Sequence, residues 1–170
     1  MRKDMRLTMP LWQMGAIVLT IILTLIMGKS TEIISTGNGS IEFEFTIAGT
    51  TGYVFIATTI VFFLYMFFFL LRIYQHNRRY PEKRINAFSF KPQEYIEEPQ
   101  VFDELTKRAT KKVYSYYSWV LPIFVGVSLI TFWSRTMILI GILVIALGQY
   151  WIYYASIQNN LRKIETEEKT

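Results

Sequence analysis

The chain contains no cysteine and only one histidine among its 170 residues. The absence of cysteine excludes disulfides, thiolate nucleophiles and cysteine-ligated metals. The single histidine, His76, cannot by itself form a bis-histidine haem site, an H-E-x-x-H zinc site or a proton relay. The sequence also lacks a G-x-S-x-G elbow and a glycine-rich phosphate loop. We therefore expect no catalytic residues, no bound metal and no cofactor, and interpret the protein as a non-enzyme.

Acidic residues, lysine and histidine are missing from four long apolar runs, in a chain whose hydrophobic fraction is 52%. The runs cover residues 11–28, 53–75, 116–133 and 137–156. Each is about long enough to cross a hydrocarbon core of roughly 30 Å at about 1.5 Å per residue. The short connection at residues 134–136 forces the last two runs to be antiparallel. The sequence predicts an all-α integral membrane protein with four transmembrane helices in two antiparallel hairpins.

The first apolar run has a second interpretation, because the basic residues Arg2, Lys3 and Arg6 precede it, as in a cleaved signal peptide. Its apolar stretch is long for such a peptide, however, and no A-x-A cleavage site follows Gly28. We therefore favour a transmembrane helix at residues 11–28.

Lysine and arginine are unevenly placed along the chain, which carries 18 of them against 13 acidic residues. Sixteen lie in residues 1–10, 72–112 and 157–170, and the other two are Lys29 and Arg135. Because cytoplasmic loops retain an excess of Lys and Arg, we expect the sixteen on the cytoplasmic side of the cell membrane. The cytoplasmic parts are then the two termini and the long loop, residues 1–10, 157–170 and 76–115. The external parts are residues 29–52 and 134–136.

The external loop at residues 29–52 contains two short runs on either side of a glycine-rich turn. Residues 41–47 alternate apolar and polar side chains, which is the period of a half-buried strand. The Asn38-Gly39 pair before them tolerates the positive φ angles of a tight turn. The pattern predicts either a short β-hairpin over residues 32–47 or an irregular loop with one apolar face at the membrane interface.

The long cytoplasmic loop changes character at Pro99. Before it, prolines disfavour helix, and apolar side chains are too numerous for a purely solvated linker. After it, apolar residues recur at helical spacing, so we expect a helix from about residue 100 that runs into the third span and extends it into the cytoplasm. The apolar and charged residues of this loop require a surface to cover them. The candidate partner-binding residues are Arg84, Ile85, Phe88, Phe90, Tyr95, Ile96 and Phe102.

Small and hydroxyl-bearing residues inside the spans favour close helix packing, with hydroxyls bonding across helices at about 0.6 kcal/mol per contact. The candidate helix-packing residues are Gly126, Ser128, Gly141 and Gly148. Phenylalanines are dense in residues 62–69, so their rings must point to more than one side, and some must face lipid or another subunit. We therefore expect a homo- or hetero-oligomer.

Two functions fit these patterns. The leading hypothesis is a non-catalytic accessory, regulatory or immunity-type subunit that docks another membrane or cytoplasmic protein through the long loop, with the lipid bilayer as its other partner and no nucleic acid. The alternative is an oligomeric channel or transporter, or a membrane effector. A channel would be lined by Gln13, Thr20, Thr24, Thr58 and Thr59. The composition suggests a bacterial source, in which the expected location is the cytoplasmic membrane.

Overall fold

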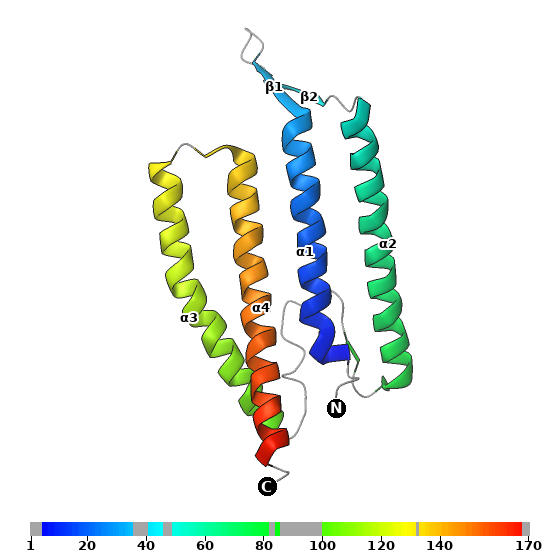
Figure 1. The fold of residues 1–170 in the computed structure, drawn as a ribbon, viewed down its shortest axis with the longest axis vertical. Helices are drawn as coiled ribbons and strands as arrows, with labels where there is room; N and C mark the ends of the chain where they lie inside the picture. The colour runs from blue at the N-terminus through cyan, green and yellow to red at the C-terminus, as the bar shows by residue number, and fades with distance from the viewer. Residues whose placement is uncertain are drawn as a thin grey trace.

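Long helices make up most of the protein and stand side by side (Figure 1). The computed structural model describes residues 5–35, 41–45, 49–81, 84–85, 100–131 and 133–167. Within these residues the elements are α1 (Met5–Ser30), β1 (Thr31–Ser35), β2 (Ile41–Phe45), α2 (Gly49–Arg79), α3 (Gln100–Ile130) and α4 (Arg135–Glu167). All four of the described helices are long and apolar enough to cross a membrane. These four candidate transmembrane helices indicate a multi-pass membrane protein.

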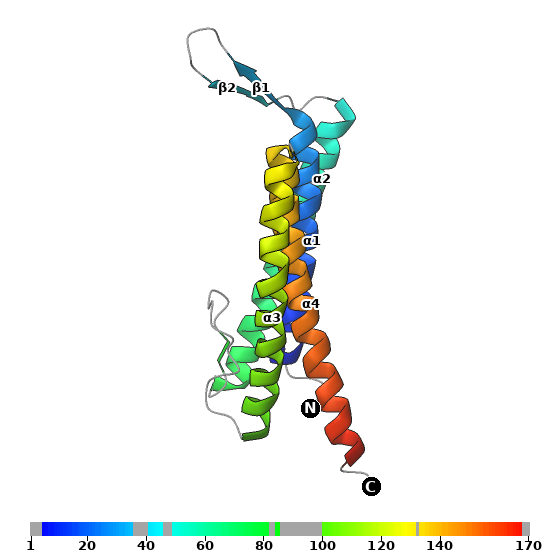
Figure 2. The same ribbon diagram turned by 90° about the vertical axis from the view of Figure 1, so that its left-hand side faces the viewer.

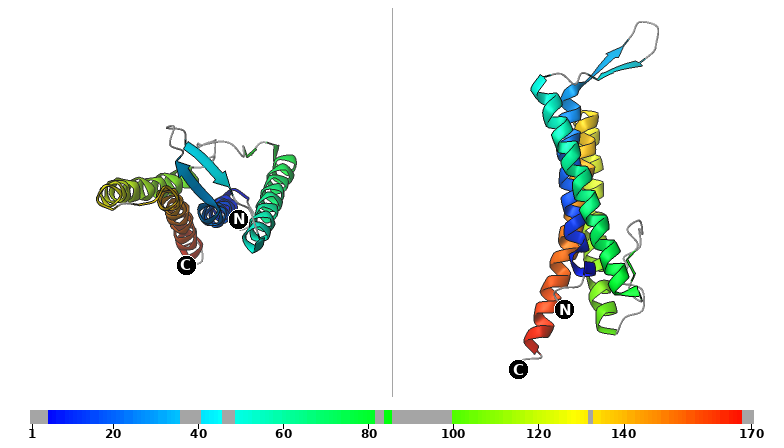
Figure 3. Two further views of the ribbon diagram at one scale, coloured as in Figure 1. Left: turned by 90° about the horizontal axis from the view of Figure 1, so that it is seen from above. Right: turned by 90° about the vertical axis from the view of Figure 1, so that its right-hand side faces the viewer.

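The helices form an open row in the order α3, α4, α1, α2 (Figure 1). Extensive contacts join α1 to α4, α3 to α4 and α1 to α2. Seen from above, α3 and α2 occupy the two ends of the row (Figure 3). At most 6% of the most apolar stretch of any described span is buried within the chain. The two predicted hairpins are thus joined through α1 and α4, and the described residues leave both broad faces of the row uncovered.

Each helix is longer than the apolar run that predicts it. α1 begins at Met5 rather than residue 11, and α4 continues to Glu167 rather than ending at residue 156. A helix of 31 residues, such as α2 or α3, measures about 46 Å, well beyond a hydrocarbon core of roughly 30 Å. Backbone hydrogen bonding therefore continues through polar residues past the apolar runs. α3 begins at Gln100, as the spacing after Pro99 predicts, and continues into the third span.

Strands β1 and β2 follow α1 directly and project from one end of the row (Figure 2). They pair antiparallel, with Thr31 opposite Phe45 and Ile33 opposite Phe43. The Asn38-Gly39 turn expected between them lies outside the described residues. The paired strands place a two-stranded element at the end of the row opposite to the start of α1 and the end of α4 (Figure 2).

The connection between α3 and α4 is a tight corner. Backbone hydrogen bonds continue past the end of α3. The Thr131 amide donates to the Val127 carbonyl at 2.9 Å, and the Trp133 amide donates to the Thr131 carbonyl at 2.8 Å. Ser134 then caps α4: its hydroxyl oxygen accepts a hydrogen bond from the Met137 amide at 3.3 Å. Arg135 is consequently the first residue of α4, not a turn residue, and the short corner holds α3 and α4 antiparallel.

Six serine and threonine hydroxyl groups inside the spans bond to their own helix, contrary to the cross-helix bonds expected from the sequence. Each donates to the carbonyl four residues earlier, at 2.6–2.9 Å, and they are Thr20, Thr24, Thr58, Thr59, Ser118 and Thr131. In a helix that carbonyl lies within reach of a β-hydroxyl, so the local bond forms without a neighbouring helix. These six hydroxyls therefore do not join helices.

Tyrosines make the cross-helix hydrogen bonds instead. The Tyr65 hydroxyl of α2 donates to the Trp12 carbonyl of α1 at 2.9 Å. On the other side of the row, the Tyr116 hydroxyl of α3 donates to the Ile145 carbonyl of α4 at 3.3 Å, and the Tyr117 hydroxyl bonds to the Gln149 side chain. A phenol reaches past its own helix, which a threonine hydroxyl does not.

Glycines provide the space for these side chains. A Cβ atom added at Gly15 would collide with the Tyr65 ring, and one at Gly148 would collide with the Tyr116 ring. Gly141 likewise accommodates Phe124 of α3. Of the remaining candidate packing residues, Gly126 has no heavy atom within 4 Å of such a Cβ among the described residues, and Ser128 has a buried hydroxyl without a described hydrogen-bond partner.

Gly28 of α1 packs against Thr136 of α4, and this contact provides a test of the helix order. A Cβ atom at Gly28 would lie 3.1 Å from the Thr136 Cβ. That is slightly closer than the roughly 3.5–4.5 Å of a disulfide. The double variant Gly28→Cys/Thr136→Cys should therefore form an intramolecular disulfide after mild oxidation, measured as protection from a thiol-reactive polyethylene glycol.

The matched control is Tyr53→Cys/Leu129→Cys, at exposed positions on the two outer helices, α2 and α3. This pair should stay reduced within the chain. Intramolecular cross-linking of the control pair, or its absence in the Gly28/Thr136 pair, would contradict the row order.

Candidate functional site

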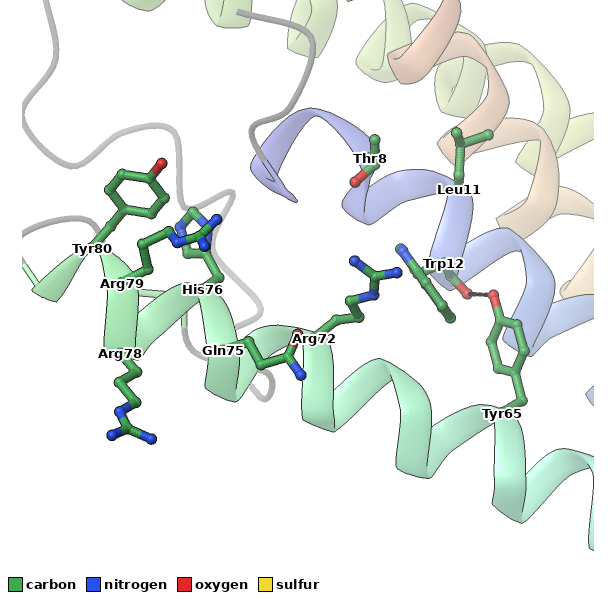
Figure 4. A pocket seen from close by; sticks show the side chains of 10 residues that line it. All are labelled: Thr8, Leu11, Trp12, Tyr65, Arg72, Gln75, His76, Arg78, Arg79 and Tyr80. Carbon is green, nitrogen blue, oxygen red and sulfur yellow. Dashed lines mark hydrogen bonds between the residues drawn. The ribbon is translucent and has the colours of Figure 1, made fainter.

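An open cleft lies between α1 and α2, at the end of the row where α1 begins and α2 ends (Figure 4). Its volume is about 960 Å³. The residues that line it are Thr8, Leu11, Trp12, Tyr65, Arg72, Gln75, His76, Arg78, Arg79 and Tyr80. We call this the basic cleft, because the described residues that line it include three arginines and no acidic side chain.

The α2 wall of the basic cleft follows from helical spacing. Tyr65, Arg72 and Arg79 are seven residues apart and so share one face of the helix. Arg72 extends across the gap toward Trp12 of α1, whereas the Arg78 side chain points away from Arg72 and from Trp12 (Figure 4). Arg72 thus reaches between the two helices (Figure 4).

An aromatic contact closes the inner end of the cleft. The rings of Trp12 and Tyr65 lie 5.2 Å apart, and the Tyr65 hydroxyl is bonded to the Trp12 carbonyl. The Trp12 ring also stacks on Phe69 at 5.9 Å. Phe69 belongs to a buried cluster with Ile73 and Ile85, which covers part of Trp12. These aromatic contacts hold α1 against α2 beside the arginines of the basic cleft.

The chain turns back after α2 and is held there by Asn77. The Asn77 Nδ2 donates to the Ile85 carbonyl at 2.8 Å, and the Ile85 amide donates to the Asn77 Oδ1 at 2.6 Å. The Ile85 side chain is 3% exposed and packs against Phe69 and Ile73. His76, 8% exposed, lies on the same turn with its ring 5.2 Å from that of Tyr80.

The structure brings two of the candidate partner-binding residues to this site. Ile85 is buried in the protein's own core, and Arg84 beside it is exposed. Phe102 lies in α3, and its side chain is not among those described. The other four, Phe88, Phe90, Tyr95 and Ile96, lie outside the described residues.

A second, smaller cleft of about 460 Å³, which is also lined by basic residues, lies at the same end of the row, between α3 and α4. Its lining residues are Arg108, Lys111, Lys112, Ser115 and Asn160. None of its described lining residues is aromatic, in contrast to the cleft between α1 and α2. Among the described residues, no group of three His, Cys, Asp or Glu side chains could hold a metal ion.

The sequence analysis did not group Arg72 and His76 with Tyr65. The seven-residue spacing of Tyr65, Arg72 and Arg79 is visible in the sequence and could have identified this wall. The α1 wall could not be identified, because nothing in the sequence pairs Trp12 with α2. Comparison with family models, curated proteins and solved structures found no match.

The Asn77–Ile85 hydrogen bonds generate a test. Asn77→Ala removes both bonds, each contributing about 0.5–1.5 kcal/mol, so the 80–85 turn should open about tenfold more often or more. Trypsin cleavage of the purified protein after Arg84, followed by mass spectrometry of the released peptides, measures this opening. Asn159→Ala, at an exposed position on α4, is the control and should leave cleavage unchanged. Equal cleavage rates in both variants would show that Asn77 does not hold the turn.

Proposed function

We propose that this protein is a non-catalytic membrane subunit that docks a partner protein at the end of the row where the basic clefts lie. The observation that carries the proposal is the open row itself. Its faces are uncovered, with Phe63 66% exposed and Trp119 72% exposed. Lipid or other transmembrane helices must cover such faces. This arrangement suits a subunit of a larger assembly.

The long loop supports docking at that end in particular. It joins α2 and α3, which are the two outer helices of the row. The loop is attached to folded structure on both sides: Ile85 is buried against α2, and Leu105, Ala109 and Val113 are buried on α3. The described residues on either side of residues 86–99, Ile85 and Gln100, are thus part of folded structure. Phe88, Phe90, Tyr95 and Ile96, which lie between them in the sequence, are the proposed contacts to the partner.

The channel alternative has less support. The candidate lining threonines Thr20, Thr24, Thr58 and Thr59 satisfy their hydroxyls within their own helices. Helices in one open layer also enclose no lumen among the described spans. A pore would need several copies arranged around it.

The proposed topology places the basic end of the row in the cytoplasm of the cell and β1 and β2 outside. It is supported by the positions of the helix ends, because α1 begins and α4 ends at the end of the row that carries both basic clefts (Figure 1). The excess of Lys and Arg is retained on the cytoplasmic side of membranes.

Cysteine labelling tests the topology directly, since the chain has no cysteine of its own. An Asn38→Cys variant should react with a membrane-impermeant maleimide in whole cells. A Glu94→Cys variant should react only after lysis. The reverse pattern would overturn the proposed orientation and would move the docking surface to the outside.

A loop variant tests docking without changing loop length. Phe88, Phe90, Tyr95 and Ile96 are changed together to serine, and the tagged protein is purified from cross-linked native membranes. The partner present in stoichiometric amount should be lost, because its apolar contacts are removed. The control changes four apolar strand residues, Ile33, Ile34, Phe43 and Phe45, to serine at the opposite end and should retain the partner. Retention of every co-purifying protein by the loop variant would refute the proposal.

A further inference from the structure

Three arginines border the basic cleft between α1 and α2, and none of its lining residues is acidic. Arginine carries its charge at any physiological pH, so it requires water or an anion as partner. Arg72 directly follows the apolar stretch of α2 and directs its guanidinium toward α1 (Figure 4). The described residues supply no carboxylate to this cleft. Arg72 therefore has no carboxylate partner among them, and an anion from outside the chain can pair with it.

The level of the cleft relative to the membrane indicates which anions lie near Arg72. Trp12 and Tyr65 lie at its inner end, and amphipathic rings of this kind settle at the level of lipid headgroups. At that level phosphate groups of the lipids are the abundant anions. The cleft is open toward the surroundings and large enough, at about 960 Å³, for a headgroup.

We propose that the basic cleft binds the phosphate headgroup of an anionic phospholipid. The planar guanidinium of Arg72 suits two parallel hydrogen bonds to phosphate oxygens. Leu11 and Trp12, on α1, offer apolar surface to the start of the acyl chains. Arg78 and Arg79 at the outer edge add positive potential, which disfavours zwitterionic lipids whose own cation would be repelled.

Lipid binding at this cleft goes beyond the proposed docking function and does not depend on it. The docking surface lies in the loop, whereas the cleft lies between α1 and α2. Lipid binding can therefore be measured on the purified protein with no partner present.

Native mass spectrometry of the detergent-solubilised protein tests the proposal, with phosphatidylglycerol and phosphatidylcholine of identical acyl chains as probes. One phosphatidylglycerol should bind per chain at a concentration at least about tenfold lower than phosphatidylcholine requires. Arg72→Gln should weaken phosphatidylglycerol binding about tenfold or more, because charge-assisted hydrogen bonds are lost. Arg72→Lys, which keeps the charge but loses the planar fork, should give an intermediate loss and also shows the effect if Arg72→Gln does not fold.

Arg84→Gln is the matched control, since it removes the same charge at the same end of the row from an exposed residue that is not among those lining the cleft. It should change binding by less than about twofold. Equal losses in the Arg72 and Arg84 variants would overturn the proposal, because they would indicate a response to net charge alone. Equal binding of the two lipids would overturn it as well. Displacement of the lipid by soluble glycerol phosphate, in an Arg72-dependent way, would assign the site to a soluble phosphate instead.

Discussion

The fold depends on close approach between neighbouring helices at glycine. Lipid is as apolar as the helix surfaces, so burial of apolar area does not drive helices together inside a membrane. The interactions that hold helices together there are van der Waals contact at short range and cross-helix hydrogen bonds. Each described helix contact has a glycine at which a larger side chain of the neighbour is received: Gly15 for α1 and α2, Gly28 for α1 and α4, and Gly141 and Gly148 for α3 and α4. The positions of these glycines explain why the helices form this row.

The same contact that joins α1 and α2 also produces the basic cleft. Gly15 and the Tyr65–Trp12 hydrogen bond bring the two helices together at one level. Beyond that level Pro10 interrupts the backbone bonding of α1, because proline has no amide hydrogen to donate. The helices carry no glycine contact there, and the long side chains of Arg72 and Gln75 occupy the border of the space between them. The cleft thus begins where the close contact between α1 and α2 at Gly15 and Tyr65 ends.

The sequence predicts the number of helices and the start of α3 well, because long apolar runs and helical spacing are local properties. It misplaces the helix ends, since hydropathy marks the bilayer and not the extent of backbone hydrogen bonding. The predicted hydrogen-bond partners of the hydroxyl groups were wrong for a related reason. The hydroxyls of Thr20 and Thr58 bond to the carbonyl four residues earlier, whereas the longer phenol of Tyr65 reaches another helix. The row order could not be predicted, because it depends on which residue faces each glycine. For the site, the α2 wall was visible as a seven-residue spacing, but its partner Trp12 was not.

The excess of cations at one end of the row does not by itself make a binding site. An orientation signal needs only charge on the correct side, and Arg78 or Arg162 would serve as well as Arg72. What separates Arg72 from them is geometry: it lies seven residues from Tyr65, on the face of α2 that is held against Trp12, and so reaches between the helices. Arg78, six residues further along, leaves a different side of α2 and points away from Arg72 (Figure 4). The charge pattern thus orients the protein in the membrane, and the aromatic contact selects one of its arginines to meet an anion in a defined place.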